Sequence, residues 1–147
     1  MRIRQANKQD INQMADLLEV LFLIESDFTI NRDKQMFGLR MLIDDPSKGI
    51  VFVADNDGKV IAMCALHYVI STAQGGVVGL IEDMIVKVNH RHKGIGSKLL
   101  ERIIEYARVK NLSRIQLLAD KDNHIALKFY EKMQFKNTKL IALRLMV

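Results

Sequence analysis

Residues 89–97 combine the groups that bind a phosphate. The stretch NHRHKGIGS holds two glycines and four basic or imidazole side chains, and an amphipathic pattern follows it directly. The amides in the first turn of a helix lack intrahelical partners and carry partial positive charge, so an anion is their natural occupant. Gly94 and Gly96 have no Cβ and let a ligand lie against the backbone. The side chains that can add polar contacts are those of Arg91, Lys93 and Ser97.

The apolar run MIVKV precedes this stretch, so the unit reads as strand, Arg-x-x-Gly-x-Gly, helix. It is not a Walker loop, which needs Gly-Lys-Ser/Thr, and it is not the Gly-x-Gly-x-x-Gly dinucleotide turn. Taken alone, the spacing leaves two interpretations open. One is a phosphate site, and the other is a glycine-containing turn with solvated basic residues.

Alternating and helical apolar patterns predict the elements that must hold this loop. Turn signals such as NDGK, and the helix-breaking pair Pro46 and Gly49, separate these elements. Strands on a central sheet with helices on both sides indicate a single α/β or α+β domain over residues 1–147. We expect strands at 3–7, 50–55, 60–69, 75–88, 115–120 and 138–147, and helices at 9–25, 32–43, from the loop to about 110, and 123–133.

Composition restricts the class of protein. The chain has 147 residues, of which 49% are hydrophobic and 27% charged, as in an ordinary soluble domain. No apolar run approaches the roughly 18 residues that span a bilayer, and the start resembles no signal peptide, so we expect a cytoplasmic protein without a membrane partner. Cys64 is the only cysteine, which excludes an internal disulfide and a cysteine-rich metal site. We expect Cys64 to be a small buried hydrophobe and predict no metal.

Charge is distributed unevenly along the chain. Residues 1–60 hold 8 Lys and Arg against 10 Asp and Glu, whereas residues 61–147 hold 14 against 7. A basic half suits a nucleic acid, but the cations are not interleaved with aromatic residues and no nucleic-acid module is present. We therefore predict no nucleic-acid partner, and favour a small polyanion on the basic half and a cationic partner on the acidic half.

Two segments in register resemble a known family. MIVKVNHRHKGIGSKLLERIIEYA looks like the acetyl-CoA-binding segment of the GNAT N-acetyltransferases, with Arg91, Gly94 and Gly96 at its three fixed positions. Downstream, DNHIALKFYEKMQF resembles the segment of that family that contains Asn and Phe-Tyr-Glu-Lys, although Gln134 stands where a glycine is customary. The resemblance implies a mixed, mostly antiparallel sheet flanked by helices on both faces.

The resemblance also implies a reaction and its residues. Acetyl-CoA gives its acetyl group to an amine by direct attack, without an acyl-enzyme. Tyr130 would protonate the leaving thiolate, since a phenol is mostly protonated at neutral pH. Asn123 would bond the pantetheine arm, or serve as a helix N-cap, or both. The implied acetyl-CoA contacts are Met84, Ile85, Val86, Arg91, His92, Lys93, Gly94, Ile95, Gly96, Ser97 and Asn123.

The attacking amine must lose a proton, and LIEDMIV offers two carboxylates. Glu82 and Asp83 are adjacent on a strand, which predicts side chains on opposite faces, and either could act as general base. The pair is similar to one in the diamine and polyamine acetyltransferases of the same family, which implies a base at Glu82 and acceptor binding at Asp83. A strand-edge salt bridge is the structural alternative. His67 and His90 are weaker candidates, and we interpret His67 as a locally packed strand residue.

The acceptor is the least defined part of the prediction. Glu25 and Asp27 follow the first helix and, with Glu82 and Asp83, could form an anionic pocket for a small cationic amine. A protein lysine, a protein N-terminus, and a non-catalytic acetyl-CoA-binding regulatory module are the alternatives. The strand expected at 138–147 is long and apolar for an edge and could pair with a second copy, so we expect a monomer or a homodimer.

Overall fold

A five-stranded sheet organises the first of two compact units in the chain. The computed structural model describes residues 1–25 and 27–147, and these divide into unit 1, Met1–Leu117, and unit 2, Leu118–Val147. In unit 1 the strand order is β1-β2-β3-β4-β5, antiparallel except for the parallel pair β4–β5. The strands are β1 Arg2–Gln5, β2 Gly49–Asn56, β3 Lys59–Ser71, β4 Gly76–Val86 and β5 Ile115–Leu117.

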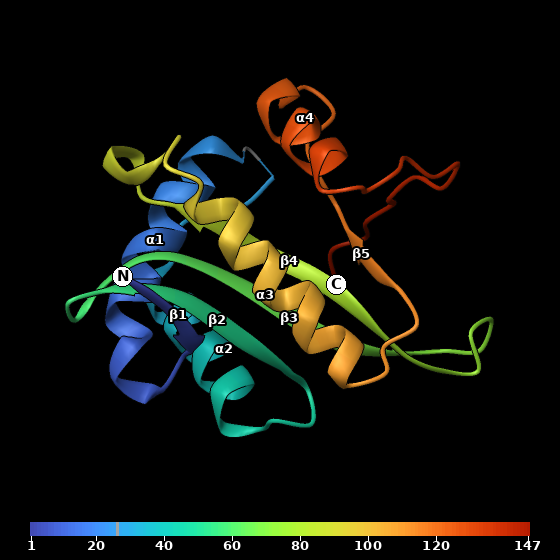
Figure 1. The fold of residues 1–147 in the computed structure, drawn as a ribbon, viewed down its shortest axis with the longest axis horizontal. Helices are drawn as coiled ribbons and strands as arrows, with labels where there is room; N and C mark the ends of the chain where they lie inside the picture. The colour runs from blue at the N-terminus through green and yellow to red at the C-terminus, as the bar shows by residue number, and fades with distance from the viewer. Residues whose placement is uncertain (26) are drawn as a thin grey trace. The chain divides into compact units, whose positions relative to one another are not determined.

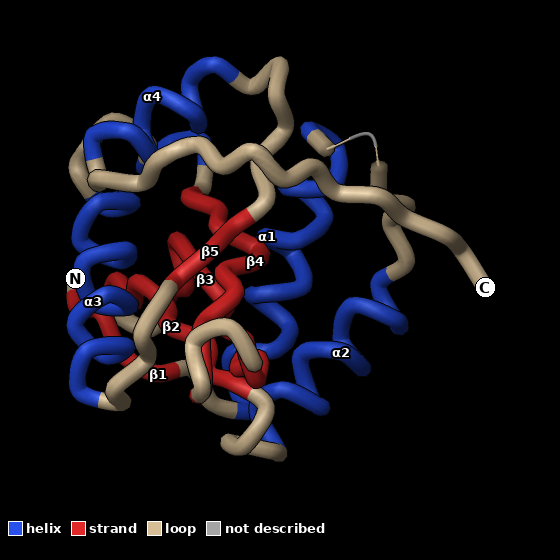
Figure 2. Tube along the Cα trace, turned by 90° about the vertical axis from the view of Figure 1, so that its right-hand side faces the viewer, coloured by secondary structure: helices blue, strands red, loops and turns tan. Residues whose placement is uncertain are grey.

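Helices cover both faces of this sheet, as Figure 2 shows. α1 (Ile11–Ile24) and α2 (Arg32–Asp44) lie on one face, and α3 (Ile95–Val109) lies on the other. Short 3-10 helices precede α1 at Lys8–Asp10 and follow β4 at Val88–His90 (Figure 1). The mixed α/β class, the mostly antiparallel sheet and the two-sided helix layers are therefore confirmed.

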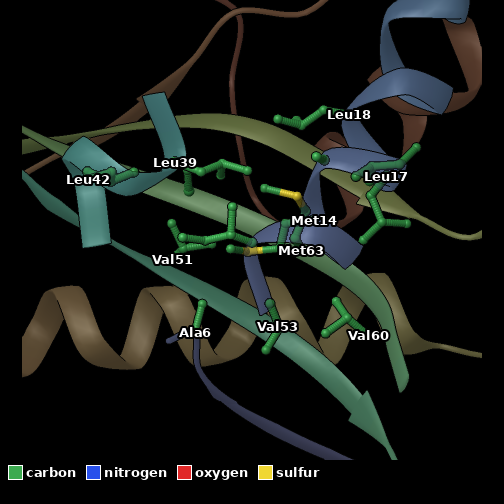
Figure 3. Packing of buried hydrophobic residues seen from close by; sticks show 14 of the residues in the cluster. Ala6, Met14, Leu17, Leu18, Leu39, Leu42, Val51, Val53, Val60 and Met63 are labelled. Atoms are coloured by element: carbon green, nitrogen blue, oxygen red, sulfur yellow. The ribbon is translucent and has the colours of Figure 1, made fainter. Parts of the chain in front are cut away.

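The core between the sheet and α1–α2 is made by apolar positions of alternating strands and periodic helices. Val51 and Val53 of β2 point into it, while Phe52 between them contacts Tyr106 of α3 on the opposite face. This alternation is what the strand pleat requires. Figure 3 shows the packed cluster, which includes Met14, Leu17, Leu18, Leu39, Leu42, Val51, Val53, Val60 and Met63.

The β2–β3 hairpin follows its turn signal. Asn56 pairs with Lys59, and the two residues between them, Asp57 and Gly58, have φ of 53° and 81°. Positive φ at both central positions is the type I′ turn that matches strand twist and favours Asp-Gly. The expected helices at 9–25 and 32–43 also formed, within one or two residues of their predicted ends.

The strand predicted at 138–147 is wrong, and the one predicted at 115–120 is shorter than expected. Residues 138–147 have no regular structure and expose their apolar side chains, Leu143 by 88%. A strand forms only where a neighbour accepts and donates its backbone hydrogen bonds, and within the described residues the sheet ends at β5. An apolar run supplies no such neighbour by itself.

Unit 2 contains one helix, α4 (His124–Lys132), at the predicted place. Asn123 caps it, and Phe129, Tyr130 and Phe135 pack their rings together with centroids 5.2 and 5.9 Å apart. Across residues 1–25 and 27–147, no helix is both long enough and apolar enough to cross a membrane.

Candidate active site

An extra residue in β4 sets the geometry around the two adjacent carboxylates. Ala65 pairs with Glu82 and Met63 pairs with Ile85, so Asp83 and Met84 share the place opposite a single residue of β3, Cys64. Such a bulge bends a strand and re-aims its side chains. Asp83 adopts φ of 55°, a left-handed conformation that Asp tolerates better than most residues. The regular alternation behind the expected opposite faces of Glu82 and Asp83 therefore does not hold at Asp83.

Asp83 lies in an environment that disfavours its charge. Burial, then the carboxylates of Glu82 and Glu25, raise the pKa of Asp83 from 3.8 to about 7. Glu25 is the C-cap residue of α1, and its charge is one of the causes of the raised pKa of Asp83. Three of the four predicted acidic residues are thus brought together. Asp27 is exposed in the segment after α1.

His67 of β3 faces Glu82. Its Nε2 lies 3.4 Å from the Glu82 carboxylate Oε2, and the two side chains are 33% and 51% exposed. Antiparallel pairing explains the contact, because Glu82 sits opposite Ala65 and His67 is two residues farther along the same face. His67 thus has the local polar contact expected of it, and the partner is a candidate base. His90, the other weak candidate, ends the short helix after β4.

β4 extends beyond its parallel neighbour. Pairing with β5 ends at Ile81, opposite Leu117, whereas β4 continues to Val86. On the β3 side, Ile85 and Val86 remain paired with Met63 and Ala62. Among the described residues, the other edge of this part of β4 has no strand partner. An extended ligand could hydrogen-bond along such an edge in the way an added strand does.

The loop after β4 is held by its own basic side chains. Arg91 Nε donates to the Val86 carbonyl at 2.9 Å, and Lys93 Nζ donates to the Asn89 carbonyl at 3.0 Å. His92 and Gly94 both have positive φ, 61° and 74°. The two cations expected to meet an anion therefore also shape the loop, and glycine at 94 is required by the backbone conformation.

Gly94 is the N-cap of α3 and leaves its first-turn amides without a capping side chain. By contrast, Asn31 caps α2 and Asn123 caps α4, each through its side-chain oxygen. Ile95 is buried and anchors the helix start, while Gly96 and Ser97 are half-buried. An uncapped N-terminus beside basic residues is a suitable place for a phosphate.

Of the two predicted site residues of unit 2, Asn123 is the N-cap of α4 and Tyr130 lies within the helix. The Asn123 Oδ1 accepts a hydrogen bond from the Ala126 amide at 3.1 Å, so the N-cap interpretation of Asn123 is confirmed. Tyr130 is half-buried and packs between the rings of Phe129 and Phe135. That packing restricts the ring and would hold its hydroxyl in a defined direction.

Cys64 is fully buried beneath the bulge. Burial, and then the charge of Asp83, raise the pKa of the Cys64 thiol far above its ordinary value. A thiol in this state is a poor nucleophile. Within residues 1–25 and 27–147, no cluster of three or more His, Cys, Asp or Glu residues could hold a metal ion.

The chain belongs to the acetyltransferase (GNAT) family, whose model matches residues 13–135. An uncharacterised N-acetyltransferase from Archaeoglobus fulgidus is 26% identical over 138 residues, which is 92% of this chain and 93% of that protein. The protein is therefore an N-acetyltransferase of the acetyl-CoA-dependent acyltransferase class.

Solved structures agree on the fold. A possible acetyltransferase from Clostridium difficile superposes with a TM-score of 0.89 at 24% identity, covering 99% of this chain and 97% of that one. A predicted acetyltransferase from Clostridium acetobutylicum, solved with acetyl-CoA, superposes with a TM-score of 0.80 at 21% identity, covering 97% and 95%. The GNAT fold binds acetyl-CoA.

Two features of the site were missed by the sequence analysis. The bulge at Asp83 has no residue signature beyond an Asp that tolerates positive φ. The contact of His67 with Glu82 could have been anticipated by pairing the two strands outward from their turn, because the register from Ser71–Gly76 to Ala65–Glu82 is unbroken and the bulge lies beyond it.

The pKa of Asp83 makes stability depend on pH. Between pH 3.8 and about 7 the folded chain holds a proton at Asp83 that the unfolded chain has lost, so this residue's contribution to stability falls as pH rises. Asp83→Asn should remove that fall. Its free energy of unfolding relative to wild type, from urea denaturation, should rise between pH 4 and 7, by about 4 kcal/mol at most.

The matched control for this measurement is Asp57→Asn, an exposed Asp that also has positive φ. Its difference from wild type should stay flat across the same range. If Asp83→Asn and wild type lose stability in parallel with pH, Asp83 titrates normally and its raised pKa is refuted.

Proposed function

We propose that this N-acetyltransferase acetylates the primary amine of a small cationic acceptor by direct attack on acetyl-CoA, without an acyl-enzyme. The observation that carries the proposal is the group of Glu25, Glu82 and Asp83, which we call the acidic group. The ionised form of a buried carboxylate is unfavourable beside two other carboxylates when no cation pairs with it. The raised pKa of Asp83 reflects that cost. A bound ammonium would offset the repulsion, so the site favours a cation.

A small acceptor with more than one positive charge suits the acidic group best. One amine must become neutral to react, while a second can remain an ammonium paired with a carboxylate. Asp83 is assigned as the partner of that ammonium, because a neighbouring cation would stabilise the ionised form that burial and the two other carboxylates disfavour. Asp27, beyond the end of α1, would add negative charge to the approach.

Glu82 is assigned as the general base. Its side chain is 51% exposed, so a proton taken from the attacking amine can pass on to water. The amine nitrogen then attacks the thioester carbon, the C–N bond forms, and the C–S bond breaks. Since the one cysteine is buried with a raised thiol pKa, an acyl-cysteine intermediate is unfavourable.

Acetyl-CoA is assigned to the loop after β4 and to the extended edge of that strand. The pyrophosphate would lie on the amides of residues 92–97, with the cations of Arg91 and Lys93 adding charge. The pantetheine arm would run along the backbone of Met84, Ile85 and Val86. Two observations support this assignment. The N-terminus of α3 has no capping side chain, and β4 extends beyond its pairing with β5.

Tyr130 is assigned as the acid that protonates the departing thiolate, and Asn123 as a further partner of the pantetheine arm. A phenol carries its proton at neutral pH, and ring packing within unit 2 limits where that proton can be delivered. Asn123 already uses its Oδ1 as a cap, which leaves its amide NH₂ as the group that can donate to the ligand.

An amine panel with CoA release as the readout tests the proposed acceptor class. Diamines should have the lowest KM, monoamines a higher KM, and lysine-containing and free N-terminal peptides should react poorly. Asp83→Asn should raise KM for a diamine about tenfold and change kcat little, whereas Glu82→Gln should lower kcat, most at low pH where the amine is least often neutral.

Peptides outcompeting every small amine would reassign the acceptor to a protein lysine or N-terminus. Tight acetyl-CoA binding with no turnover on any amine would indicate a non-catalytic regulatory module. Matching kinetics for Asp83→Asn and Glu82→Gln at all pH values would remove the division of roles between the two carboxylates.

Gly96→Val tests the phosphate site. A branched side chain in the first turn of α3 would occupy the space in which the pyrophosphate meets the amides, so acetyl-CoA affinity measured by calorimetry should fall at least 100-fold. Gly38→Val is the matched control, since a Cβ at this α2 position meets nothing within 4 Å. Unchanged affinity in a folded Gly96→Val protein would place the cofactor elsewhere.

Tyr130→Phe tests the proposed acid. Removing the hydroxyl while keeping the packed ring should lower kcat by about 10²–10⁴-fold and leave acetyl-CoA affinity nearly unchanged. Phe129→Leu is the comparison, because it alters the ring cluster and retains the Tyr130 hydroxyl. Turnover of Tyr130→Phe near the wild-type rate would assign thiolate protonation to water.

A further inference from the structure

We propose that His67 is a positioning residue that orients the Glu82 carboxylate toward the acceptor amine. The inference deepens the proposed function, since it depends on Glu82 being the base. The supporting observation is the contact of His67 on β3 with Glu82 on β4. His67 is assigned no contact with acetyl-CoA or with the acceptor.

The His67 Nε2 atom lies beside the Glu82 carboxylate. Among the residues the structure describes, this atom is buried and has no hydrogen-bond partner, while Oε2 of Glu82 lies 3.4 Å away. That distance is slightly longer than an ordinary N–H···O bond, which spans about 2.7–3.2 Å. Glu82 is half-exposed and can rotate, so a small movement of its carboxylate completes the bond.

The proton on the imidazole decides what the contact does. A bare Nε2 lone pair would repel the carboxylate oxygen, whereas an Nε2–H, in the neutral ring or the imidazolium, donates to it. Leaving a buried imidazole nitrogen unpaired is costly, so the protonated Nε2 and the ionised carboxylate stabilise one another. The arrangement therefore fixes the direction in which a Glu82 carboxylate oxygen points.

The backbone at His67 is closely packed against β2. Gly49 of β2 pairs with His67, and a Cβ at Gly49 would meet the Leu66 carbonyl oxygen, the His67 Cα and the Leu42 side chain. A glycine there lets β2, β3 and α2 approach closely.

Two acidic groups belong to the same region. The charges of Glu82 and Glu25 both act on Asp83 of β4. From α2 and β2 the neighbours are Leu42 and Gly49. Beside these carboxylates, the Nε2–H of His67 is a group that can donate a hydrogen bond to Glu82.

A double-mutant cycle with a pH profile tests the proposal. In the full chain, with the best amine of the panel, His67→Ala should lower kcat about tenfold and move the acid limb of kcat/KM to higher pH, with the KM for acetyl-CoA unchanged. His67→Gln, whose amide can donate to the same oxygen, should restore part of the rate. In the Glu82→Gln background, His67→Ala should have no further effect.

Tyr68→Phe is the matched control. Tyr68 is the adjacent residue of β3, and its hydroxyl bonds Tyr106 of α3 at 2.8 Å on the opposite face of the sheet. The variant removes one polar group from the same strand and should leave the pH profile unchanged. Circular dichroism and the melting temperature establish that each variant is folded.

The outcomes separate this inference from the proposed function. If Glu82→Gln alone lowers turnover but His67→Ala superimposes on wild type, or multiplies the Glu82→Gln defect, His67 does not act through Glu82 and the inference is overturned. If Glu82→Gln is fully active, the base assignment itself fails. If His67→Ala and Tyr68→Phe shift the profile equally, the effect comes from β3 as a whole, which also overturns the inference.

Discussion

The extra residue of β4 at Asp83 is the constraint on which the candidate site depends. Without the extra residue, the two residues from Met63 to Ala65 would be matched by two residues of β4. The side chains of Glu82 and Asp83 would then point to opposite faces of the sheet. The bulge allows a buried Asp to lie beside Glu82 while the end of α1 brings Glu25 near. A positive φ at a non-glycine residue costs free energy, and functional sites are where proteins retain such conformations.

β4 and the loop after it are assigned to different parts of acetyl-CoA. Beyond Ile81, β4 has lost its parallel neighbour but keeps its antiparallel one, so one edge is held and the other is available. Arg91 and Lys93 each donate a hydrogen bond to a backbone carbonyl, and these bonds fix the turn that leads into α3. A loop organised in this way presents uncapped amides to a phosphate without first having to become ordered, and preorganisation of that kind improves affinity.

Much of unit 1 could be predicted because its signals are local. Asp57-Gly58 specified the hairpin, and the periodic apolar residues of α1 specified its buried face. The loop and the family followed from Arg91, Gly94 and Gly96, whose spacing reflects one backbone conformation. The bulge was not predictable, since it arises from the register between two strands. The strand expected at 138–147 failed for the same kind of reason: its apolar pattern was real, but a strand also needs a partner in space.

The uneven charge of the chain acquires a physical meaning from this arrangement. The basic half contains the loop assigned to a polyanionic co-substrate, while the acidic half contributes Glu25 to the group assigned to a cationic acceptor. Opposite charges at the two binding regions let each attract its own ligand and disfavour the other. Asp83 links cation binding to protonation, because a cation that pairs with its carboxylate must displace a proton near neutral pH. In the proposed mechanism, acceptor binding at Asp83 and amine deprotonation at Glu82 therefore use two neighbouring carboxylates of one acidic group, each with its own role.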